Sequence, residues 1–159
     1  MPPMPARRLA ALTALALVPA TAGCGASDSP PVDAACTASP DAIERALARA
    51  PAPVALPSGT RLSECVAGAR SDSDLQNTGL VLSRTADHLA ERAQRGDAAA
   101  ALDLGYLVGA ARRGAARTNG IHAELAHRME SAARVLVAGG RPGVAGALRR
   151  GLRAGEATG

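Results

Sequence analysis

The chain has almost no aromatic side chains with which to fill a core. Tyr106 is its single tyrosine, and it contains no Phe and no Trp, although hydrophobic residues make up 47% of its 159 residues. The apolar residues are mainly Ala, Leu and Val, each of which buries little area. Backbones must therefore approach closely to exclude water. Strand patterns are scarce and helical periodicity is common, so the sequence predicts an all-α fold.

Capping residues and apolar periodicity predict a small up-and-down bundle of about four to five helices, with one or two extra turns after residue 60. The apolar fraction is too high for a wholly disordered chain, and glycine has no collagen period. The expected helical stretches are 40–50, 62–69, 71–95, 98–117, 121–138 and 142–152.

Two of these stretches carry the clearest signals. The segment Ser71-Asp72-Ser73-Asp74 has the form of a capping box, and the helix that it opens is expected to stop at Gly96. Residues 98–111 are apolar almost all round, which is typical of a buried core helix at this length. Gly105 and Gly109 within that stretch predict close approach of a neighbouring helix.

The first 23 residues have the layout of a secretory signal peptide. Arg7 and Arg8 precede a ten-residue apolar run from Leu9 to Val18, and Pro19 and small residues follow. Ten residues are too few to cross a bilayer, which needs about 20. The sequence therefore predicts that residues 1–23 are removed during export. The Arg count then falls from 18 to 16 against 14 acidic residues, which leaves a formal charge of +2.

The end of this segment resembles the lipobox of bacterial lipoproteins. Thr21-Ala22-Gly23-Cys24 has small residues before the Cys, although the first position is Thr where that class usually has Leu. The resemblance covers residues 1–24 and implies a diacylglyceryl group on the sulfur of Cys24 and usually an acylated amine. Two or three acyl chains anchor a protein stably, at about 0.8 kcal/mol for each buried methylene.

Residues 24–35 are small, polar and rich in Pro, so they are expected to form a flexible linker, and residues 36–155 to form the helical domain. Cys36 and Cys65 remain as a pair. In an exported protein such a pair is more often a disulfide than a reactive thiol pair, and these two lack the C-x-x-C spacing of redox motifs. A loop of about 30 residues closed in this way contributes about 3–4 kcal/mol in the chain-entropy model.

No motif for catalysis, metal or cofactor stands out. His88, His122 and His127 do not form an H-E-x-x-H pattern, and no Ser lies in a nucleophile elbow. An enzyme is therefore not expected. Asp103 is the most informative polar residue, because a carboxylate within a core helix is either a structural partner of an Arg or part of a site. A pocket between helices near Asp103 and Tyr106 is the ligand-binding alternative.

The charged residues predict surfaces. Glu-to-Arg pairs four residues apart, such as Glu130 with Arg134, are typical of solvated helix faces. Two Arg groups lack nearby acids in the sequence, and anionic lipid headgroups or acidic cell-wall polymers are the contacts that they favour. Nucleic acid is not expected, because export and the lack of stacking residues oppose it. The two groups are Arg112, Arg113 and Arg117, and Arg141, Arg149, Arg150 and Arg153.

The sequence thus predicts a lipoprotein of the cell envelope, tethered to the outer face of the cytoplasmic membrane or to an outer membrane where one exists. Its helical domain is expected to be a structural or interaction module that contacts an unidentified protein, a lipid or a polymer. A small-ligand-binding lipoprotein is the alternative.

Overall fold

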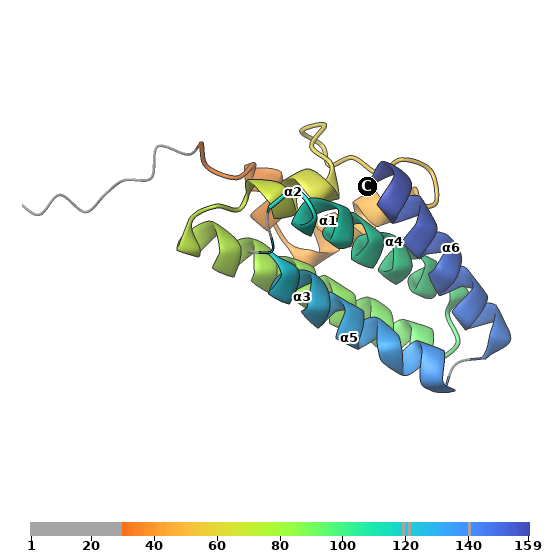
Figure 1. Ribbon diagram of the computed structural model, residues 1–159. Coiled ribbons are helices and arrows are strands. Elements are labelled where there is room, and N and C mark those ends of the chain that lie inside the picture. The colour runs from red at the N-terminus through yellow and green to blue at the C-terminus, as the bar shows by residue number, and fades with distance from the viewer. Residues whose placement is uncertain (1–29, 119, 121, 140) are drawn as a thin grey trace, which may run out of the picture.

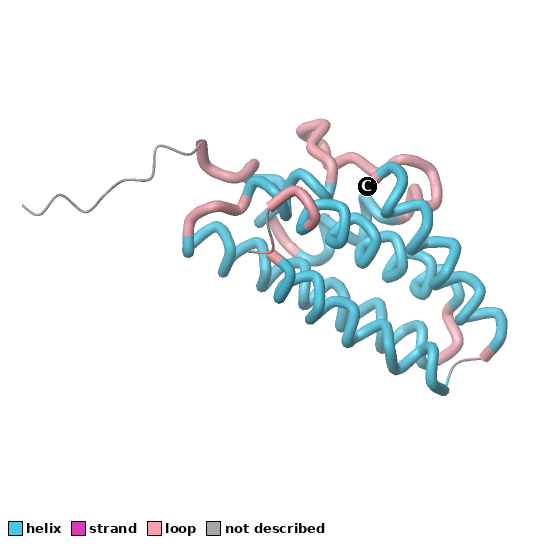
Figure 2. Tube along the Cα trace, viewed as in Figure 1, coloured by secondary structure: helices cyan, strands magenta, loops and turns pink. Residues whose placement is uncertain are grey.

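A computed structural model describes residues 30–118, 120, 122–139 and 141–159. The predicted signal peptide and Cys24 lie outside these residues. The described chain is all-helical, as expected, with a short 3₁₀ helix η1 followed by six α-helices (Figures 1 and 2). The elements are η1 (Ala34–Thr37), α1 (Pro40–Leu47), α2 (Leu62–Gly68), α3 (Asp72–Gln94), α4 (Ala98–Ala115), α5 (Ala123–Gly139) and α6 (Pro142–Thr158).

The helix starts lie where the capping residues predict them. The hydroxyl of Ser39 accepts a hydrogen bond from Ala42 N at 3.1 Å, and Pro40 occupies the first turn of α1. Ser71 caps α3 in the same way, through Asp74 N at 3.1 Å. These side chains satisfy amide groups that have no partner within the helix, and so they fix where each helix begins.

A tight turn joins the two longest helices. Gly96 adopts a φ of +103°, a conformation that side chains rarely take, and it ends α3. One residue later the carboxylate of Asp97 accepts from Ala99 N and Ala100 N, both at 3.0 Å, and opens α4. The antiparallel α3–α4 hairpin follows from these two residues.

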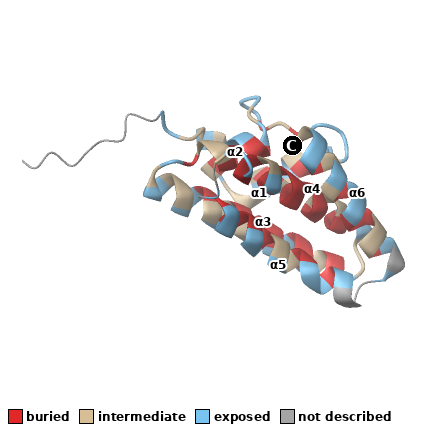
Figure 3. Cartoon of the chain, in the orientation of Figure 1, coloured by how far each residue is buried: buried red, intermediate tan, exposed pale blue. Residues whose placement is uncertain are grey.

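Helix α4 lies at the centre of the domain (Figure 3). From Leu104 to Ala111 every residue is buried, and α2, α3, α5 and α6 all pack against this helix. The core around it is built mainly from Ala, Leu and Val, with Tyr106 as its single aromatic ring. Among the described residues, no helix combines the length and the apolar character that crossing a membrane requires.

The closest packing in the fold joins α4 to α6, which run in the same direction (Figure 1). A Cβ atom at Gly151 of α6 would overlap the carbonyl oxygen of Leu102 and lie 2.8 Å from Tyr106 N. One turn along, a Cβ atom at Gly155 would lie 2.9 Å from Ala110 N. Gly105 and Gly109 of α4 face α6 in the same manner. Glycine at each of these positions lets the two backbones touch, and the expectation of close approach is confirmed.

Successive helices of the bundle alternate in direction, but α4 and α6, which pack against each other, are parallel. In a regular bundle the first and third of three consecutive helices lie diagonally apart. Here α4 and α6 are that pair, and their glycines bring them into contact, while α5 has only a sparse interface with α6. Along α6, Val144 and Leu148 are buried, whereas Leu152 is only partly buried. The face that contacts α4 includes Gly151 and Gly155 beside these side chains.

The disulfide fastens the N-terminal part of the domain. Cys36 in η1 and Cys65 in α2 are both fully buried and are bonded to each other, with their Cα atoms 5.5 Å apart. Packing begins before residue 36. Val32, which the sequence analysis assigned to the linker, contacts the core, and Asp33 caps η1 and accepts a hydrogen bond from Thr60. That bond lowers the pKa of the Asp33 carboxyl below its ordinary value.

The glycines of α6 allow a matched test of the α4–α6 contact. Gly151→Ala should lower the free energy of unfolding by about 2–3 kcal/mol, because the added methyl group forces two backbones apart. Gly146→Ala lies on the same helix with only the end of the Arg150 side chain nearby, 3.7 Å away. It should instead raise stability by about 0.5–1 kcal/mol through helix propensity. Urea unfolding measures both, and equal effects would contradict the backbone contact.

Candidate functional site

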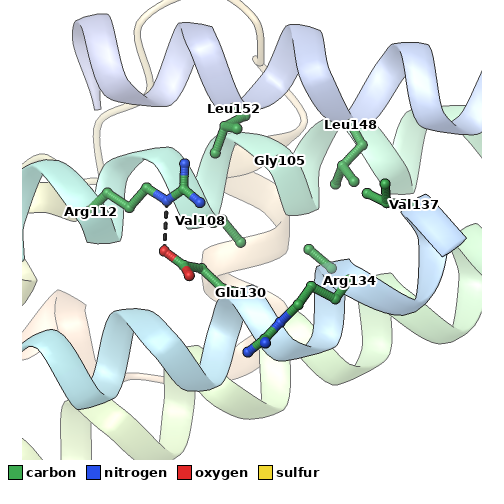
Figure 4. A pocket seen from close by; sticks show the side chains of 9 residues that line it. Gly105, Val108, Arg112, Glu130, Arg134, Val137, Leu148 and Leu152 are labelled. Atoms are coloured by element: carbon green, nitrogen blue, oxygen red, sulfur yellow. Dashed lines mark hydrogen bonds and ion pairs between the residues drawn. The ribbon is translucent and has the colours of Figure 1, made fainter.

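An apolar pocket lies between α4, α5 and α6 (Figure 4). Its volume is about 240 Å³, and it is half-open to solvent. Aliphatic side chains form most of its wall, and charged residues stand at one end and beside it. The lining residues are Gly105, Val108 and Arg112 from α4, Glu130, Ala133, Arg134 and Val137 from α5, and Leu148 and Leu152 from α6.

The pocket is a consequence of the α4–α6 contact. Because α6 is drawn onto the backbone of α4, it stands away from α5, and the space between them is not filled by large side chains. Gly105 and Ala133 contribute no more than a methyl group each to the wall. Val137 is 61% exposed at the rim, whereas Leu148 is buried deeper, at 5%.

A charged cluster that joins three helices closes one end of the pocket. Arg112 Nε donates to Glu130 of α5 at 2.7 Å, and Arg112 Nη1 donates to Glu156 of α6 at 3.1 Å. The first of these bonds contributes most to raising the pKa of the Arg112 guanidinium. Glu130 thus pairs with Arg112 across helices, not with Arg134 on its own helix, and Arg134 instead donates to Ser131.

Tyr106 is a structural residue of the core. Its ring is fully buried, and its hydroxyl oxygen accepts from Val54 N at 2.9 Å. Thr158 Oγ1 lies 3.0 Å from the same hydroxyl and already donates its own proton to Ala154 O. The Tyr106 hydroxyl therefore donates to Thr158. These bonds join α4 to the loop after α1 and to the last turn of α6, and Tyr106 does not line the pocket.

Asp103 also lies away from the pocket, on the side of α4 that faces α1 and the end of α3. Arg92 is the nearby cation, and it is already bound to Glu44 at 3.1 Å and to Asp97 at 2.9 Å. Burial is the main cause that raises the pKa of the Asp103 carboxyl to about 6. Arg92 lowers it and the two other carboxylates raise it further. Asp97 is the opposite case, since backbone amides and Arg92 lower its pKa.

The expected cluster of Arg112, Arg113 and Arg117 is not a single basic surface. Arg112 is neutralised by two carboxylates, and Arg113 Nη1 donates to the carbonyl oxygens of Glu156 at 2.9 Å and Ala157 at 2.5 Å, where it caps α6. Arg117 is exposed after the end of α4. The interpretation of these residues as lacking acidic partners is therefore wrong for Arg112, because its partners come from helices that lie far from it in sequence.

The second expected Arg group divides in the same way. Arg141 donates to the carbonyl oxygen of Arg95 at 3.2 Å and so fastens the start of α6 to the α3–α4 turn. Arg149, Arg150 and Arg153 are exposed on the outer side of α6. Within the described part of the chain they form no ion pair. Within this Arg group, these three residues are the ones that form an exposed basic surface.

The histidines do not gather. No group of three metal-ligating side chains occurs within the described ranges. His122 is buried and its Nε2 lies 2.6 Å from the carbonyl oxygen of Ala69, which fastens the start of α5 to the loop before α3. His88 lies 3.5 Å from Glu44 beside the Arg92 cluster. Both histidines therefore make structural contacts, His122 with the backbone and His88 with a carboxylate.

The part of the pocket wall that α5 and α6 supply was not predicted from the sequence. On the face of α5 that packs into the core, Leu125, Met129 and Leu136 are buried and Ala132 is half-buried. Ala133 and Val137 lie on the adjacent face, four residues apart. This second stripe of small and apolar residues on α5, together with Gly105 on α4, is visible in the sequence. It lines a cavity only because α6 lies away from α5.

A second hollow of about 560 Å³ lies between α3 and α5 and is more open to solvent. Gly79 and the 52%-exposed Leu80 belong to its wall, with Glu124 and Arg128 at the edge. Glu124 and Arg128 pair at 3.0 Å, as the sequence predicts for residues four apart on a helix. Leu75 and Gly79 of α3 line this hollow and are therefore only half-buried.

In comparisons with known proteins, no family model, no curated protein and no solved structure matches this chain.

The Asp103 carboxyl predicts a pH-dependent stability. The folded state holds its proton up to about pH 6, whereas an unfolded carboxyl releases it near its ordinary value of 3.8. Its contribution is therefore complete below about pH 4 and is lost as the pH rises through 6. Asp103→Asn should raise the free energy of unfolding by about 1–2 kcal/mol at pH 7.5, after allowance for solvent screening of this half-buried group.

The same variant should approach the wild-type protein at pH 3, where the wild-type carboxyl is protonated in the folded state and mostly protonated in the unfolded state. Urea unfolding at the two pH values measures the difference, and comparison with wild type at each pH cancels the other titrating groups. A destabilised Asp103→Asn protein at pH 7.5 would show that the electrostatic attraction of Arg92 outweighs burial.

Proposed function

We propose that this protein is an exported lipoprotein of the cell envelope whose helical domain acts as an interaction module. The lipobox-like residues 21–24 supply the anchor, and residues 25–31 connect it to the first packed residue, Val32. The domain then stands at the membrane surface. Its anchor and its binding surfaces are separate parts of the chain.

The observation that carries the proposal is the buried disulfide between Cys36 and Cys65. Disulfides persist in oxidising compartments outside the cytosol, which is where a signal peptide would deliver the domain. The bond closes a loop within a small core with one aromatic ring, where it contributes about 3–4 kcal/mol in the chain-entropy model. The N-terminal motif and the cysteine chemistry thus support the same location by independent arguments.

The interaction surfaces follow from what remains exposed. Arg149, Arg150 and Arg153 form a cationic strip on α6 that suits anionic headgroups, acidic cell-wall polymers or an acidic protein surface. The hollow beside Leu80, between α3 and α5, offers an apolar contact surface apart from the cationic strip on α6. These surfaces replace Arg112 and Arg113 as the favoured contacts with a partner.

A small-ligand-binding lipoprotein is the second candidate, and the pocket between α4, α5 and α6 favours it. Concave, mainly apolar cavities with a few polar groups are where small ligands bind. The site that we propose for such a ligand lies beside Gly105 and Ala133, and not beside Tyr106, whose hydroxyl is occupied by Val54 and Thr158.

The anchor is tested by Cys24→Ser in the full chain. Wild-type protein should sediment with the membrane fraction, and the variant should move to the soluble exported fraction because it has no sulfur to acylate. Cys36→Ser and Cys65→Ser together form the control, which should keep the anchor while losing stability. Metabolic labelling with a radioactive fatty acid should mark the wild type and this control only. Equal fractionation of Cys24→Ser and wild type would overturn the anchor.

The interaction module is tested by crosslinking in native membranes, comparing wild type with the triple variant of Arg149, Arg150 and Arg153 to Gln. We expect the variant to lose crosslinks to acidic envelope components while circular dichroism shows an unchanged helical domain. Arg45, Arg49 and Arg84 changed to Gln make a control with the same change of charge elsewhere. Identical crosslinks for the variant and wild type would exclude this surface.

A further inference from the structure

We propose that the pocket between α4, α5 and α6 binds one extended aliphatic chain, such as the acyl chain of a fatty acid or a membrane lipid, with the headgroup outside. The inference deepens the second candidate function and is independent of the anchor at Cys24. It rests on the shape of the pocket, on the chemistry of its wall and on the charge at its closed end.

The pocket has the dimensions of a single hydrocarbon chain. Its wall follows α4 from Gly105 to Arg112, a distance of about 10 Å at 1.5 Å for each helical residue. The matching stretch of α5 runs from Glu130 to Val137 and has the same length. Over that distance the pocket is an elongated, half-open channel. An extended alkyl chain is long and narrow in the same way.

The same dimensions exclude larger occupants. A helix with side chains is about 10–12 Å wide, as much as the whole length of this pocket. To enter, a partner helix would have to push α5 and α6 further apart, and α6 is held in place by its backbone contact with α4 at Gly151 and Gly155. A saturated chain of the length of octanol, laid straight along the pocket, spans the same distance of about 10 Å.

The wall is aliphatic and offers no surface for stacking. Val108, Leu148, Leu152 and Val137 form its sides, and Ala133 and Gly105 make room between them (Figure 4). Tyr106 is the single aromatic residue and is buried elsewhere with its hydroxyl bonded to other parts of the chain. A flat heterocycle would find no ring to stack on and few hydrogen-bonding groups, whereas a saturated chain contacts methyl groups along its whole length.

The charged end of the pocket predicts tolerance of different headgroups. Arg112 there is shared by Glu130 and Glu156, so this cluster holds one cation and two anions. Arg134, the other cation of the lining, donates to Ser131 on its own helix. The cluster of Arg112 does not attract a carboxylate, and we infer that the aliphatic ligand binds through its methylenes. An alcohol and a carboxylate of equal chain length should therefore bind with similar affinity.

Calorimetric titration of the full-length protein tests this inference, in a bile-salt detergent that has no alkyl chain to compete. Octanol and octanoate should bind with dissociation constants that agree within about threefold at pH 7.5. Hexanol lacks two methylenes and should bind about fifteenfold more weakly, since each methylene is worth about fourfold in affinity. Decanol should gain less than threefold over octanol, because the pocket is full.

Variants locate the binding. Ala133→Leu fills the pocket and should weaken octanol binding at least tenfold, while Ala99→Leu, at an exposed position on α4, should leave it unchanged. If Ala133→Leu does not fold, as judged by circular dichroism, Val137→Asp replaces it. Val137 is 61% exposed, so an acid there is tolerated by the fold but faces the chain. This variant should weaken octanol binding about fivefold.

A lysophospholipid with an eight-carbon acyl group distinguishes the two possible sources of the aliphatic ligand, a membrane lipid and a free fatty acid. Binding comparable to octanol supports a membrane lipid as the source, and binding of octanol and octanoate alone supports a free fatty acid. No binding of any aliphatic chain, or equal binding by Ala133→Leu and Ala99→Leu, would overturn the inference. Binding of an aromatic or sugar ligand that Ala133→Leu abolishes would overturn it too, while the ligand-binding function itself would stand.

Discussion

The contact between the backbones of α4 and α6 determines the arrangement of this domain. Gly105 and Gly109 on one helix meet Gly151 and Gly155 on the other, and each position has no room for a Cβ atom. With one aromatic ring in the whole chain, the core cannot be filled by bulky side chains. Bringing two helix backbones together replaces that missing volume, because the dispersion contacts then come from main-chain atoms.

That contact has a consequence on the other side of α6. A helix held against the backbone of α4 cannot also pack closely against α5, and the side chains available there are too small to close the space. The result is a pocket whose wall is aliphatic and whose end is closed by the Arg112, Glu130 and Glu156 cluster. Stability and a potential binding site therefore have the same origin, namely the distribution of glycine along two helices.

Smaller interactions fasten the other elements to this pair. The disulfide joins η1 to α2, Tyr106 joins α4 to the loop at Val54 and to Thr158, and Arg92 joins α1 to the start of α4 through Glu44 and Asp97. Asp103 stands beside the last of these groups without an ion pair of its own. Burial therefore dominates its titration, and it is better explained as a half-buried structural carboxyl than as part of the pocket.

Local chemistry in the sequence was sufficient to define the helices. Ser39, Ser71 and Asp97 cap their own helices, and Gly96 ends one, because these effects act over three or four residues. The all-α class and the buried nature of α4 were predicted from capping and apolar periodicity. The pairing of Cys36 with Cys65 was predicted instead from the number of cysteines and the expected export. Gly105 and Gly109 likewise indicated close approach of another helix, although not which one.

The partners across helices were decided only by the tertiary structure. Arg112 finds Glu130 and Glu156, which lie 18 and 44 residues away in the chain, so no local pattern identifies them. The pocket exists because α6 lies parallel to α4 and away from α5. From its sequence alone, α6 could place either its leucines or its glycines against the core. Apolar periodicity indicates only a leucine face on α6. In the folded protein the glycines of α6 also face α4, because only glycine permits the backbone contact that completes a core with so few large side chains.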